Sequence, residues 1–464
     1  MSLYSALLRK TVYPYVLRHD GHTKAQAYYD FFKESQFWSR EKLLEYQNEK
    51  LIHLLDYAYK NCPFYTKAFD SRGLKPSDIK SAADLVKLPI LKRQDLFDHR
   101  EEIVSRAYDL NKLVKKFSGG SSGIQAEVYR NENTFLEKLG MSWRHDSWMG
   151  RERCDKLAYI WPAAMDLVPD ASWKFQIKQR YMLREMIYNA GAAKADQIKK
   201  IHENYTKFNP DYVKCFASAL YLFVTSCQKL GLELKPVKGV LSTGEPLYPY
   251  QRQLFEETFQ TNIVDMYGAR ETGNNACECE KNNGLHIAVE TCLVEFVKDG
   301  QHVAPGEEGE IFITDFTNDA FPLIRYQIND YGIPLAGDCG CGRGLPRMTA
   351  GVGRIQDDIF APDGTRLSGV TLNVHLTNGL VVQIGQMQII QRELDRFHVI
   401  ITDDPKPTPA VYEYINKTMR DIISEDIKID IEVVKEIPYE KSGKFRFIKS
   451  ELPEEYKKRL NIIE

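Results

Sequence analysis

The feature that most constrains the fold is an alternation of short apolar runs with helical or turn-rich segments between about residues 113 and 350. Apolar runs of strand length lie at 156–161, 237–242, 262–267 and 309–314. Such alternation is typical of layered α/β proteins. We therefore predict the α/β fold class, with an α/β core over about 101–353.

Different patterns flank this core. Leu44, Leu51, Leu55 and Ala58 have helical spacing, and they precede a helix-ending Asn-Cys-Pro at 61–63. These residues predict a helical preface over about 1–100, which completes a large N-terminal domain at 1–353. Strand-like runs lie at 380–391, 397–402 and 429–434, and a helix is expected near 410–424. They predict a small α+β domain over 354–464.

Composition excludes several classes of protein. The chain has 464 residues, 43% of them hydrophobic and 27% charged, which are average values for globular proteins and not those of disordered or collagen-like chains. The 62 Lys and Arg against 64 Asp and Glu give a net charge of −2, so overall charge recruits neither nucleic acid nor an anionic membrane. No run approaches the roughly 18 apolar residues of a membrane span.

The first 22 residues alternate apolar groups with Arg9, Lys10 and Arg18, which interrupts any signal-peptide hydrophobic region. We therefore expect a cytoplasmic protein. Four apolar residues of this stretch could share a helix face: Leu3, Leu7, Leu8 and Val12. A helix docked on its own domain is the favoured interpretation, and a surface-binding helix is the alternative.

A Ser- and Gly-rich segment is the first candidate for chemistry. It comprises Ser118, Gly119, Gly120, Ser121, Ser122 and Gly123. Glycines permit close backbone approach, and the hydroxyl and N–H groups can surround polyphosphate oxygens. No Gly-Lys-Ser/Thr closes the segment as in a Walker loop, so an ordinary hairpin loop is the alternative.

Two apolar runs further along end in polar turns, at 239–247 and at 262–273. Strand ends in α/β proteins project polar groups into a shared crevice, so both turns could face one ligand. Two ordinary strand ends are the alternative.

The order of the motifs is more specific than any one of them. The motifs occur along the chain in this order: the Ser/Gly loop, Gly-Glu-Pro at 244–246, Tyr-Gly-Ala-Arg-Glu-Thr at 267–272, Arg-Tyr-Gln-Ile-Asn-Asp at 325–330, Gly-Arg at 353–354 and Ser-Gly-Lys at 442–444. This set resembles the adenylate-forming superfamily of acyl-CoA synthetases, adenylation domains and luciferases. The segments 61–65, 88–92, 267–272 and 279–286 resemble its phenylacetate-CoA ligase branch, including relatives encoded in capsular-polysaccharide gene clusters.

The resemblance implies a large multilayer domain, a small mobile C-terminal lid and a two-step ligase reaction. A substrate carboxylate attacks the α-phosphorus of MgATP and pyrophosphate leaves. A nucleophile, usually the thiol of coenzyme A, then opens the acyl-adenylate.

The resemblance also implies roles for single residues. Ser118–Gly123 should hold the phosphates, Glu271 should hold Mg²⁺, and Thr272 should touch the α-phosphate. The groups expected around adenine and ribose are Gly244, Glu245, Pro246, Tyr267, Gly268 and Asp330.

In the C-terminal region, Lys444 matches the superfamily's catalytic lysine, which bridges the α-phosphate and the incoming carboxylate in the closed state. Arg354 lies at the position of the hinge between the two domains in this family. Either Asp357 or Asp358 is the hinge aspartate, because Gln356 lengthens the usual spacing by one residue.

Two motifs depart from the family pattern. Ile124 and Gln125 replace the usual Lys-Pro after the phosphate loop, which removes one cation unless Lys115, Lys116 or Arg130 substitutes. In the ribose segment 326–330, only the end residues of the usual pattern are kept.

Three cysteines and one histidine make a complete set of tetrahedral Zn²⁺ ligands: Cys279, His286, Cys339 and Cys341. Cys-x-Cys is a tighter chelate than the usual Cys-x₂-Cys, so spacing alone leaves free thiols as an equal alternative. Similar clusters in the phenylacetate-CoA ligase branch favour zinc. With no vacant position the ion would be structural, joining the loop after Glu271 to the loop after Asp330.

These observations predict an AMP-forming, ATP-dependent ligase with CoA as acceptor. The first alternative is acyl transfer to an amine or hydroxyl of a sugar, carrier or protein. The second is a catalytically weakened nucleotide-binding scaffold. The sequence specifies neither the carboxylic acid nor the oligomeric state, so a homodimer stays one of the alternatives.

Overall fold

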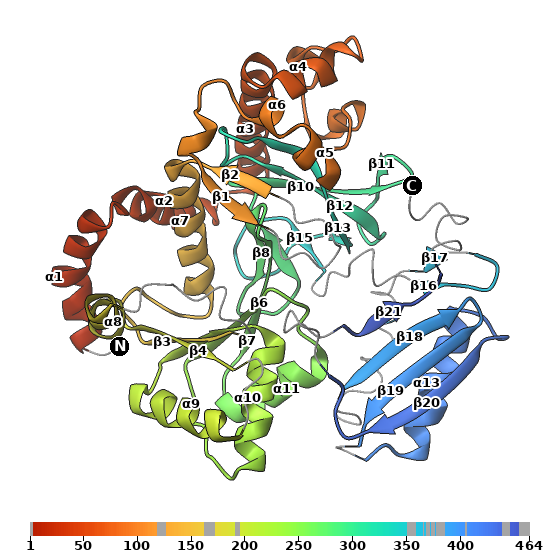
Figure 1. The fold of residues 1–464 in the computed structure, drawn as a ribbon. Coiled ribbons are helices and arrows are strands. Elements are labelled where there is room, and N and C mark those ends of the chain that lie inside the picture. Colours follow the sequence, from red (N-terminus) through yellow and green to blue (C-terminus); the bar gives the residue numbers. More distant parts are fainter. Residues whose placement is uncertain are drawn as a thin grey trace.

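The computed structural model describes residues 3–117, 127–161, 172–190, 195–349, 359–364, 366–367, 372, 376, 386–403, 406–438 and 446–453. Its mixed α/β architecture confirms the predicted fold class (Figure 1). The predicted domain boundary at Gly353 lies outside the described residues.

The first hundred residues are helical. They form α1 (Leu3–His19), α2 (Thr23–Ser35), α3 (Arg40–Asn61), α4 (Pro63–Asp70), α5 (Arg93–Asp98) and α6 (Arg100–Ile103). Ser39 caps α3 by accepting a hydrogen bond from the N–H of Lys42. At its other end Cys62 is extended, as the residue before a proline prefers, and Pro63 begins α4.

A nine-stranded sheet forms the centre of the molecule, in the order β14-β15-β9-β8-β7-β6-β5-β3-β4. Its parallel part consists of β3 (Leu157–Trp161), β4 (Glu185–Asn189), β5 (Tyr212–Cys215), β6 (Gly239–Thr243) and β7 (Ile263–Ala269). Its antiparallel part adds β8 (Gly273–Glu278), β9 (Leu285–Ile287), β14 (Pro334–Leu335) and β15 (Arg347–Met348).

Helices cover both faces of this sheet. On one face lie α9 (Ala195–Phe208), α10 (Ala217–Lys229) and α11 (Pro249–Phe259), whose apolar side chains pack against Ile160, Val213 and Val240 (Figure 1). On the other lies α7 (Glu132–Trp148), beside α2. A side chain at Gly239 would meet the carbonyl oxygen of Met149 at 2.3 Å, so this close approach requires glycine.

A second, four-stranded sheet has the order β11-β10-β12-β13. Its strands are β10 (Cys292–Lys298), β11 (Gln301–His302), β12 (Gly309–Asp315) and β13 (Leu323–Gly332). The run 309–314, which we assigned to α/β layers, thus lies in an antiparallel sheet. No helix stands between β10 and β12, so these strands pair through short connections and not through a parallel crossover.

The C-terminal region has its own core. It contains the sheet β20-β19-β18-β21 and the helix α13 (Pro409–Ile422). The strands are β18 (Met387–Glu393), β19 (Arg396–Thr402), β20 (Lys428–Val434) and β21 (Ile448–Ser450). Tyr248, just before α11, packs against Phe447 and so joins this region to the rest of the molecule.

Candidate functional site

Several of the expected site residues lie outside the described part of the chain. They are Ser118, Gly119, Gly120, Ser121, Ser122, Gly123, Ile124, Gln125, Arg354, Gln356, Asp357, Asp358 and Lys444. Their roles stay predictions. The described candidates are Gly244, Glu245, Pro246, Tyr267, Gly268, Glu271, Thr272 and Asp330.

The structure brings together residues from both sheets. The hydroxyl of Tyr267, on β7, donates a hydrogen bond of 2.8 Å to Oδ2 of Asp330, on β13. In the neighbouring strand Thr243 pairs with Met266, so the Gly-Glu-Pro turn begins beside Tyr267. Segments 60 to 90 residues apart thus meet at one edge, as a shared nucleotide site requires.

The Gly-Glu-Pro turn is held by the start of α10. Gly244 has φ +82°, and a side chain there would meet the ring of Phe216 at 2.4 Å. Oε1 of Glu245 accepts hydrogen bonds from the N–H of Ser218 at 2.6 Å and from its hydroxyl at 2.5 Å. A carboxylate is favourable at a helix N-terminus, so Glu245 fixes the backbone of this turn.

Glu271 is almost fully buried and has a cationic neighbour. The guanidinium of Arg93, on α5, lies 3.3 Å from its Oε1. The hydroxyl of Tyr326 donates to the same oxygen at 3.5 Å, and burial raises the pKa of this tyrosine so that it stays protonated. The carboxylate is therefore oriented by groups from the helical preface and from β13.

The backbone that follows β7 is held by Arg130. This residue ends β2 (Glu127–Arg130), which pairs antiparallel with β1 (Val114–Phe117). Its guanidinium donates to the carbonyl oxygen of Arg270 and, at 3.1 Å, to that of Glu271. Arg130 thus connects the strand that follows the Ser/Gly segment to the turn that carries Glu271.

The pairing of β1 with β2 bears on two open questions. Phe117 lies opposite Glu127, so the two ends of the Ser/Gly segment are held side by side, which suits a hairpin and a phosphate loop equally. Of the three proposed replacements for the missing loop cation, Lys115 pairs with Glu127 at 2.7 Å and Arg130 holds backbone carbonyls, whereas Lys116 is exposed.

Lys138, on α7, holds the next carbonyl. Its Nζ donates to the carbonyl oxygen of Thr272 at 2.6 Å and to Oδ2 of Asp315 at 2.5 Å. Burial lowers the pKa of Lys138 to about 8, although Asp315 opposes this shift. Asn275 donates to the hydroxyl of Thr272 at 2.8 Å. Both the main chain and the side chain of Thr272 are therefore fixed.

We call Tyr267, Glu271, Thr272 and Asp330 the nucleotide edge. Sequence reasoning missed Arg93, Lys138 and Asn275, which orient it. Arg93 follows directly on the segment 88–92, and β13 pairs with that segment through Leu91. The position of Arg93 next to that segment was the sequence signal available for it. The sequence offered no such signal for Lys138, which is a single lysine within the helix 132–148.

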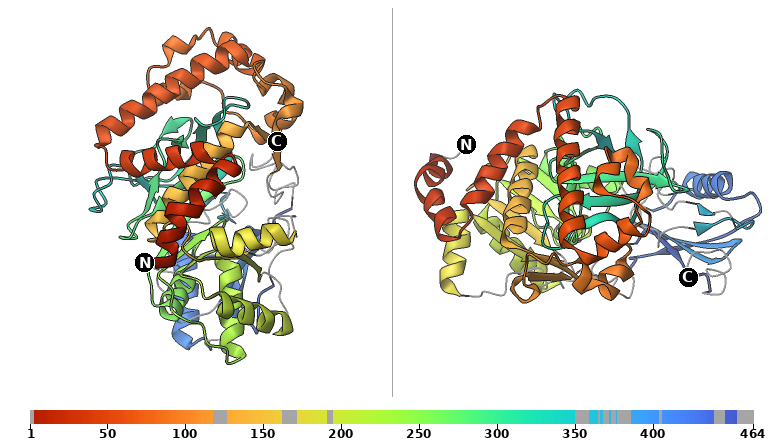
Figure 2. Two further views of the ribbon diagram at one scale, coloured as in Figure 1. Left: turned by 90° about the vertical axis from the view of Figure 1, so that its left-hand side faces the viewer. Right: turned by 90° about the horizontal axis from the view of Figure 1, so that it is seen from above.

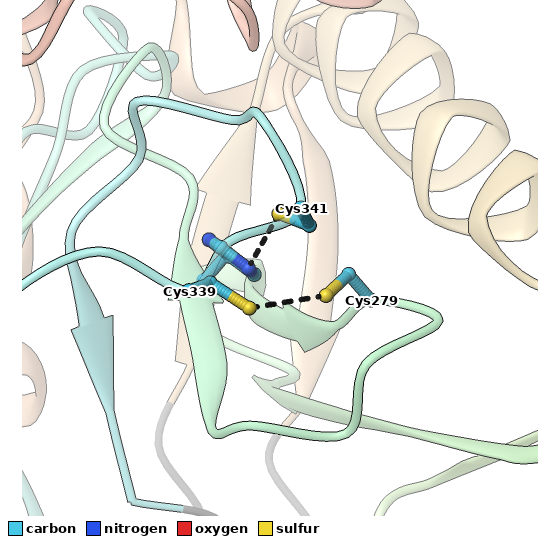
Figure 3. Close-up of side chains that lie close together, drawn as sticks. Cys279, Cys339 and Cys341 are labelled. Atoms are coloured by element: carbon cyan, nitrogen blue, oxygen red, sulfur yellow. Dashed lines mark hydrogen bonds between the residues drawn. The ribbon is translucent and has the colours of Figure 1, made fainter.

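The four predicted metal ligands form one cluster, as Figure 3 shows for the three thiols. Their ligand atoms all lie within 4.8 Å of one another. Sγ of Cys279 is 3.5 Å from Sγ of Cys339, and Sγ of Cys341 is 3.5 Å from Nε2 of His286. Zn–S bonds of about 2.3 Å in a tetrahedron would place sulfur atoms about 3.8 Å apart, close to these distances.

The surroundings of the cluster suit a metal. Nδ1 of His286 lies 3.4 Å from the carbonyl oxygen of Leu345, which favours a proton on Nδ1 and leaves Nε2 facing the thiols. Burial lowers the pKa of His286 to about 4, so the ring is neutral. Cys279 follows β8, whereas Cys339 and Cys341 precede β15, so the cluster joins two loops.

Comparisons with known proteins identify relatives of this chain. Residues 359–451 match the family model of the CapK C-terminal domain. Phenylacetate-coenzyme A ligase of Thermus thermophilus is 26% identical over 341 residues, which cover 68% of this chain and 72% of that protein. Protein CapK of Staphylococcus aureus is 22% identical over 420 residues, or 87% of this chain and 88% of CapK.

A solved structure shares the fold. The 2-hydroxyisobutyryl-CoA ligase, in its postadenylation state, has a TM-score of 0.73 and 17% identity, and the match covers 92% of this chain and 93% of that one. The chain is a homologue of the phenylacetate-CoA ligases and of CapK, with the fold of the adenylate-forming CoA ligases.

Proposed function

We propose that this protein activates a carboxylic acid with ATP, releases pyrophosphate, and transfers the acyl group from the acyl-adenylate to coenzyme A. The observation that carries the proposal is the meeting of Tyr267 with Asp330 beside the Gly-Glu-Pro turn. The names of the relatives, phenylacetate-coenzyme A ligases from several bacteria, support the same chemistry.

In this proposal the nucleotide edge binds ATP. Asp330 accepts hydrogen bonds from the ribose hydroxyls, and the ring of Tyr267 supports the adenine together with the Gly-Glu-Pro turn. The hydroxyl of Thr272 donates to the α-phosphate. Arg130 and Lys138 act as positioning residues, because each holds the backbone of this turn and leaves the reacting atoms to others.

Glu271 fits the role of Mg²⁺ ligand. Its carboxylate is buried and offers the oxygen ligands that a hard dication prefers. When bound, Mg²⁺ would neutralise charge on the phosphates as the carboxylate approaches. The protein's own task is then to keep the acid and the α-phosphorus aligned and to exclude water.

Lys444 and Arg354 extend the proposal to the C-terminal region. The ammonium of Lys444 would stabilise the negative charge that develops between the carboxylate and the α-phosphate. Rotation about the segment near Arg354 would withdraw Lys444 and admit the thiol of CoA. Both roles rest on the family resemblance.

We also propose that Cys279, His286, Cys339 and Cys341 bind a structural Zn²⁺. Four ligand atoms within 4.8 Å of one another fill a tetrahedral shell and leave no position for substrate. The ion would hold the loop after β8 against the loop that precedes β15.

Acyl transfer to an amine or hydroxyl is the second candidate. It is favoured by the extent of the similarity to CapK, which covers 87% of this chain, whereas the phenylacetate ligases cover 67–71%. The family model for residues 359–451 is also that of CapK.

Pyrophosphate exchange into ATP, screened over aryl, fatty and amino acids, tests the proposal. We expect exchange with one class of acid and thioester on addition of CoA. Exchange without thioester would favour the second candidate, and ATP binding with no exchange for any acid would favour the scaffold.

Lys444→Ala, with Lys441→Ala as a control from the same motif, tests the role of the lysine. We expect Lys444→Ala to lower exchange by about 100-fold or more and to spare thioester formation from supplied acyl-adenylate. Equal loss of both half-reactions would contradict that role.

A further inference from the structure

The helical edge formed by α1, α8 (Trp173–Ile177) and the π-helical turn η5 (Lys178–Leu183) is unusually apolar for a solvent-facing surface. Eight of the seventeen exposed large hydrophobic side chains in the described residues lie on these three elements. They are Leu3, Tyr4, Leu7, Tyr15, Trp173, Ile177, Tyr181 and Met182. Large apolar groups gathered in this way mark an interaction surface, whereas single ones do not.

These exposed side chains follow helical stripes. In α1, Leu3, Leu7, Lys10 and Arg18 are exposed within one sector of the helix, while Leu8, Tyr13, Val16 and Leu17 are buried. The expected face of Leu3, Leu7, Leu8 and Val12 is therefore divided, because Leu8 packs into the protein and Leu3 and Leu7 do not. Trp173, Ile177 and Tyr181 are four residues apart on the second segment.

The two helical segments form one surface. Arg184 follows η5, and its Nη1 donates to the hydroxyl of Ser5 at 2.5 Å, while its guanidinium lies 5.3 Å from the ring of Tyr4. Lys178 pairs with Asp20 at 2.5 Å. Figures 1 and 2 show α1 and α8 together at the end of the molecule remote from the C-terminal region.

The charge of this surface is as uneven as its hydrophobicity. Neither α1 nor the segment 173–183 contains an Asp or Glu, although the whole chain has a net charge of −2. The basic residues are Arg9, Lys10, Arg18, Lys174, Lys178 and Arg180. Arg9 and Lys178 pair with neighbouring carboxylates. For the other four, the described residues provide no ion-pair partner within 4.0 Å.

We propose that α1, α8 and η5 form a docking face for an anionic lipid bilayer. Exposed Trp, Leu and Ile side chains beside unpaired Lys and Arg are the composition of helices that lie in the membrane interface. No helix in the described ranges is both long and apolar enough to cross a bilayer, so the contact is peripheral. The exposed aliphatic groups of Leu3, Leu7 and Ile177 favour lipid over nucleic acid, because base recognition uses stacking and not aliphatic insertion.

A second copy of the chain suits this surface less well. A twofold dimer through these helices would bring the basic residues of both copies into one interface, in which α1 and the segment 173–183 provide no Asp or Glu. Like charges that approach one another in this way oppose association. Acidic lipid headgroups instead complement the lysines, while Trp173 and Leu7 insert at the boundary between the headgroups and the acyl chains.

Flotation of the full chain with vesicles tests this proposal. We expect binding to vesicles of phosphatidylcholine mixed with phosphatidylglycerol, much weaker binding to phosphatidylcholine alone, and partial release by salt. Lys10→Glu with Lys174→Glu should weaken binding by about tenfold or more. Leu7→Ser with Trp173→Ser should weaken it similarly at unchanged net charge.

Two matched controls separate this face from general charge and hydrophobicity. Lys207→Glu with Lys229→Glu makes the same change in net charge on α9 and α10, and Phe97→Ser removes an exposed aromatic ring on α5. Both should bind vesicles like the unaltered protein. All substituted side chains are exposed, so we expect every variant to fold, and thermal unfolding of each variant checks this.

Three outcomes would overturn the proposal. One is the absence of binding to anionic vesicles. Another is equal weakening in the controls and in the face variants. The third is a dimer in sedimentation that only the face variants dissociate, without vesicle binding, because a second copy would then cover this surface.

Discussion

The nucleotide edge and the Cys/His cluster connect neighbouring parts of the chain, 267–286 and 330–341, yet they are held in different ways. At the nucleotide edge each polar group has protein partners: Tyr267 binds Asp330, and Glu271 faces Arg93. In the cluster the ligand atoms of each pair lie 3.5 Å apart, and the protein groups beside the thiols are the N–H of Lys281, 3.4 Å from Sγ of Cys279, and Arg343 next to Cys341.

This difference has a physical consequence. Folding alone can complete the nucleotide edge, because its charges and hydrogen bonds are compensated within the protein. Three buried or half-buried thiols around a neutral imidazole are compensated only in part, by Arg343 and by the N–H of Lys281, and a divalent cation would complete the compensation. Loss of a nucleotide-edge group should therefore affect catalysis most, and loss of a cluster ligand should affect stability most.

Among variants of the nucleotide edge and of its supporting residues, Asp330→Ala should produce the largest effect on catalysis. It removes the acceptor that we propose for the ribose hydroxyls and leaves the hydroxyl of Tyr267 without this partner. We expect kcat/KM for ATP in pyrophosphate exchange to fall by about 100-fold, with a change in Tm of only a few degrees. Tyr267→Phe keeps the ring and should cost about fivefold. A Tm loss larger than that of the cluster variants would contradict the comparison.

Lys138→Met should have the next largest effect on catalysis. The variant keeps the length of the side chain but removes the donor to the carbonyl oxygen of Thr272 and to Oδ2 of Asp315. We expect kcat to fall by about 10- to 30-fold while KM for ATP changes little, since Lys138 positions Thr272. Lys138→Arg should restore part of the rate. A rise in KM alone would show that the lysine serves nucleotide binding.

The double variant Cys339→Ser with Cys341→Ser should lower thermal stability more than it lowers activity. We expect about one zinc per chain in the unaltered protein by metal analysis, and little in the variant. Without the ion, Tm should fall by about 5–10 °C, while exchange at low temperature stays within about fivefold of the original rate.

Cys277→Ala is the matched control, because Cys277 is buried on β8 close to the cluster but is not part of it. It should keep zinc. A protein purified without zinc, with four titratable thiols or imidazoles at this place, would refute the metal centre.

The sequence predicted more of the nucleotide edge than of its supports. The apolar runs that became β6 and β7 end in the polar turns that motif order singles out, so the meeting of Tyr267 with Asp330 could be expected. Lys138 could not, because a single lysine in an amphipathic helix looks like a solvated residue until tertiary packing buries it. Periodicity likewise placed Leu3 and Leu8 on α1 but could not say which of them packing would cover.

The same limit applies to the two sheets. The run 309–314 has the composition of a buried strand, and composition does not say which sheet a strand joins. Here the connection decides. β10 to β13 follow one another without intervening helices, and they form a separate antiparallel layer in which β10 pairs with β11 and β12, and β12 pairs with β13.

The pH dependence of exchange should give the smallest effect, and it tests whether the nucleotide edge depends on charge or only on hydrogen bonding. Burial lowers the pKa of Lys138 to about 8, so the ammonium form exists below that pH and is lost as the pH rises through it. The neutral amine still donates hydrogen bonds, but it no longer neutralises Asp315. We therefore expect kcat to decrease by about threefold above pH 8 in the unaltered protein, whereas Lys138→Arg, which stays charged, should keep its rate to higher pH. An identical alkaline decrease in both proteins would assign the titration to another group and would leave Lys138 with a role in hydrogen bonding alone.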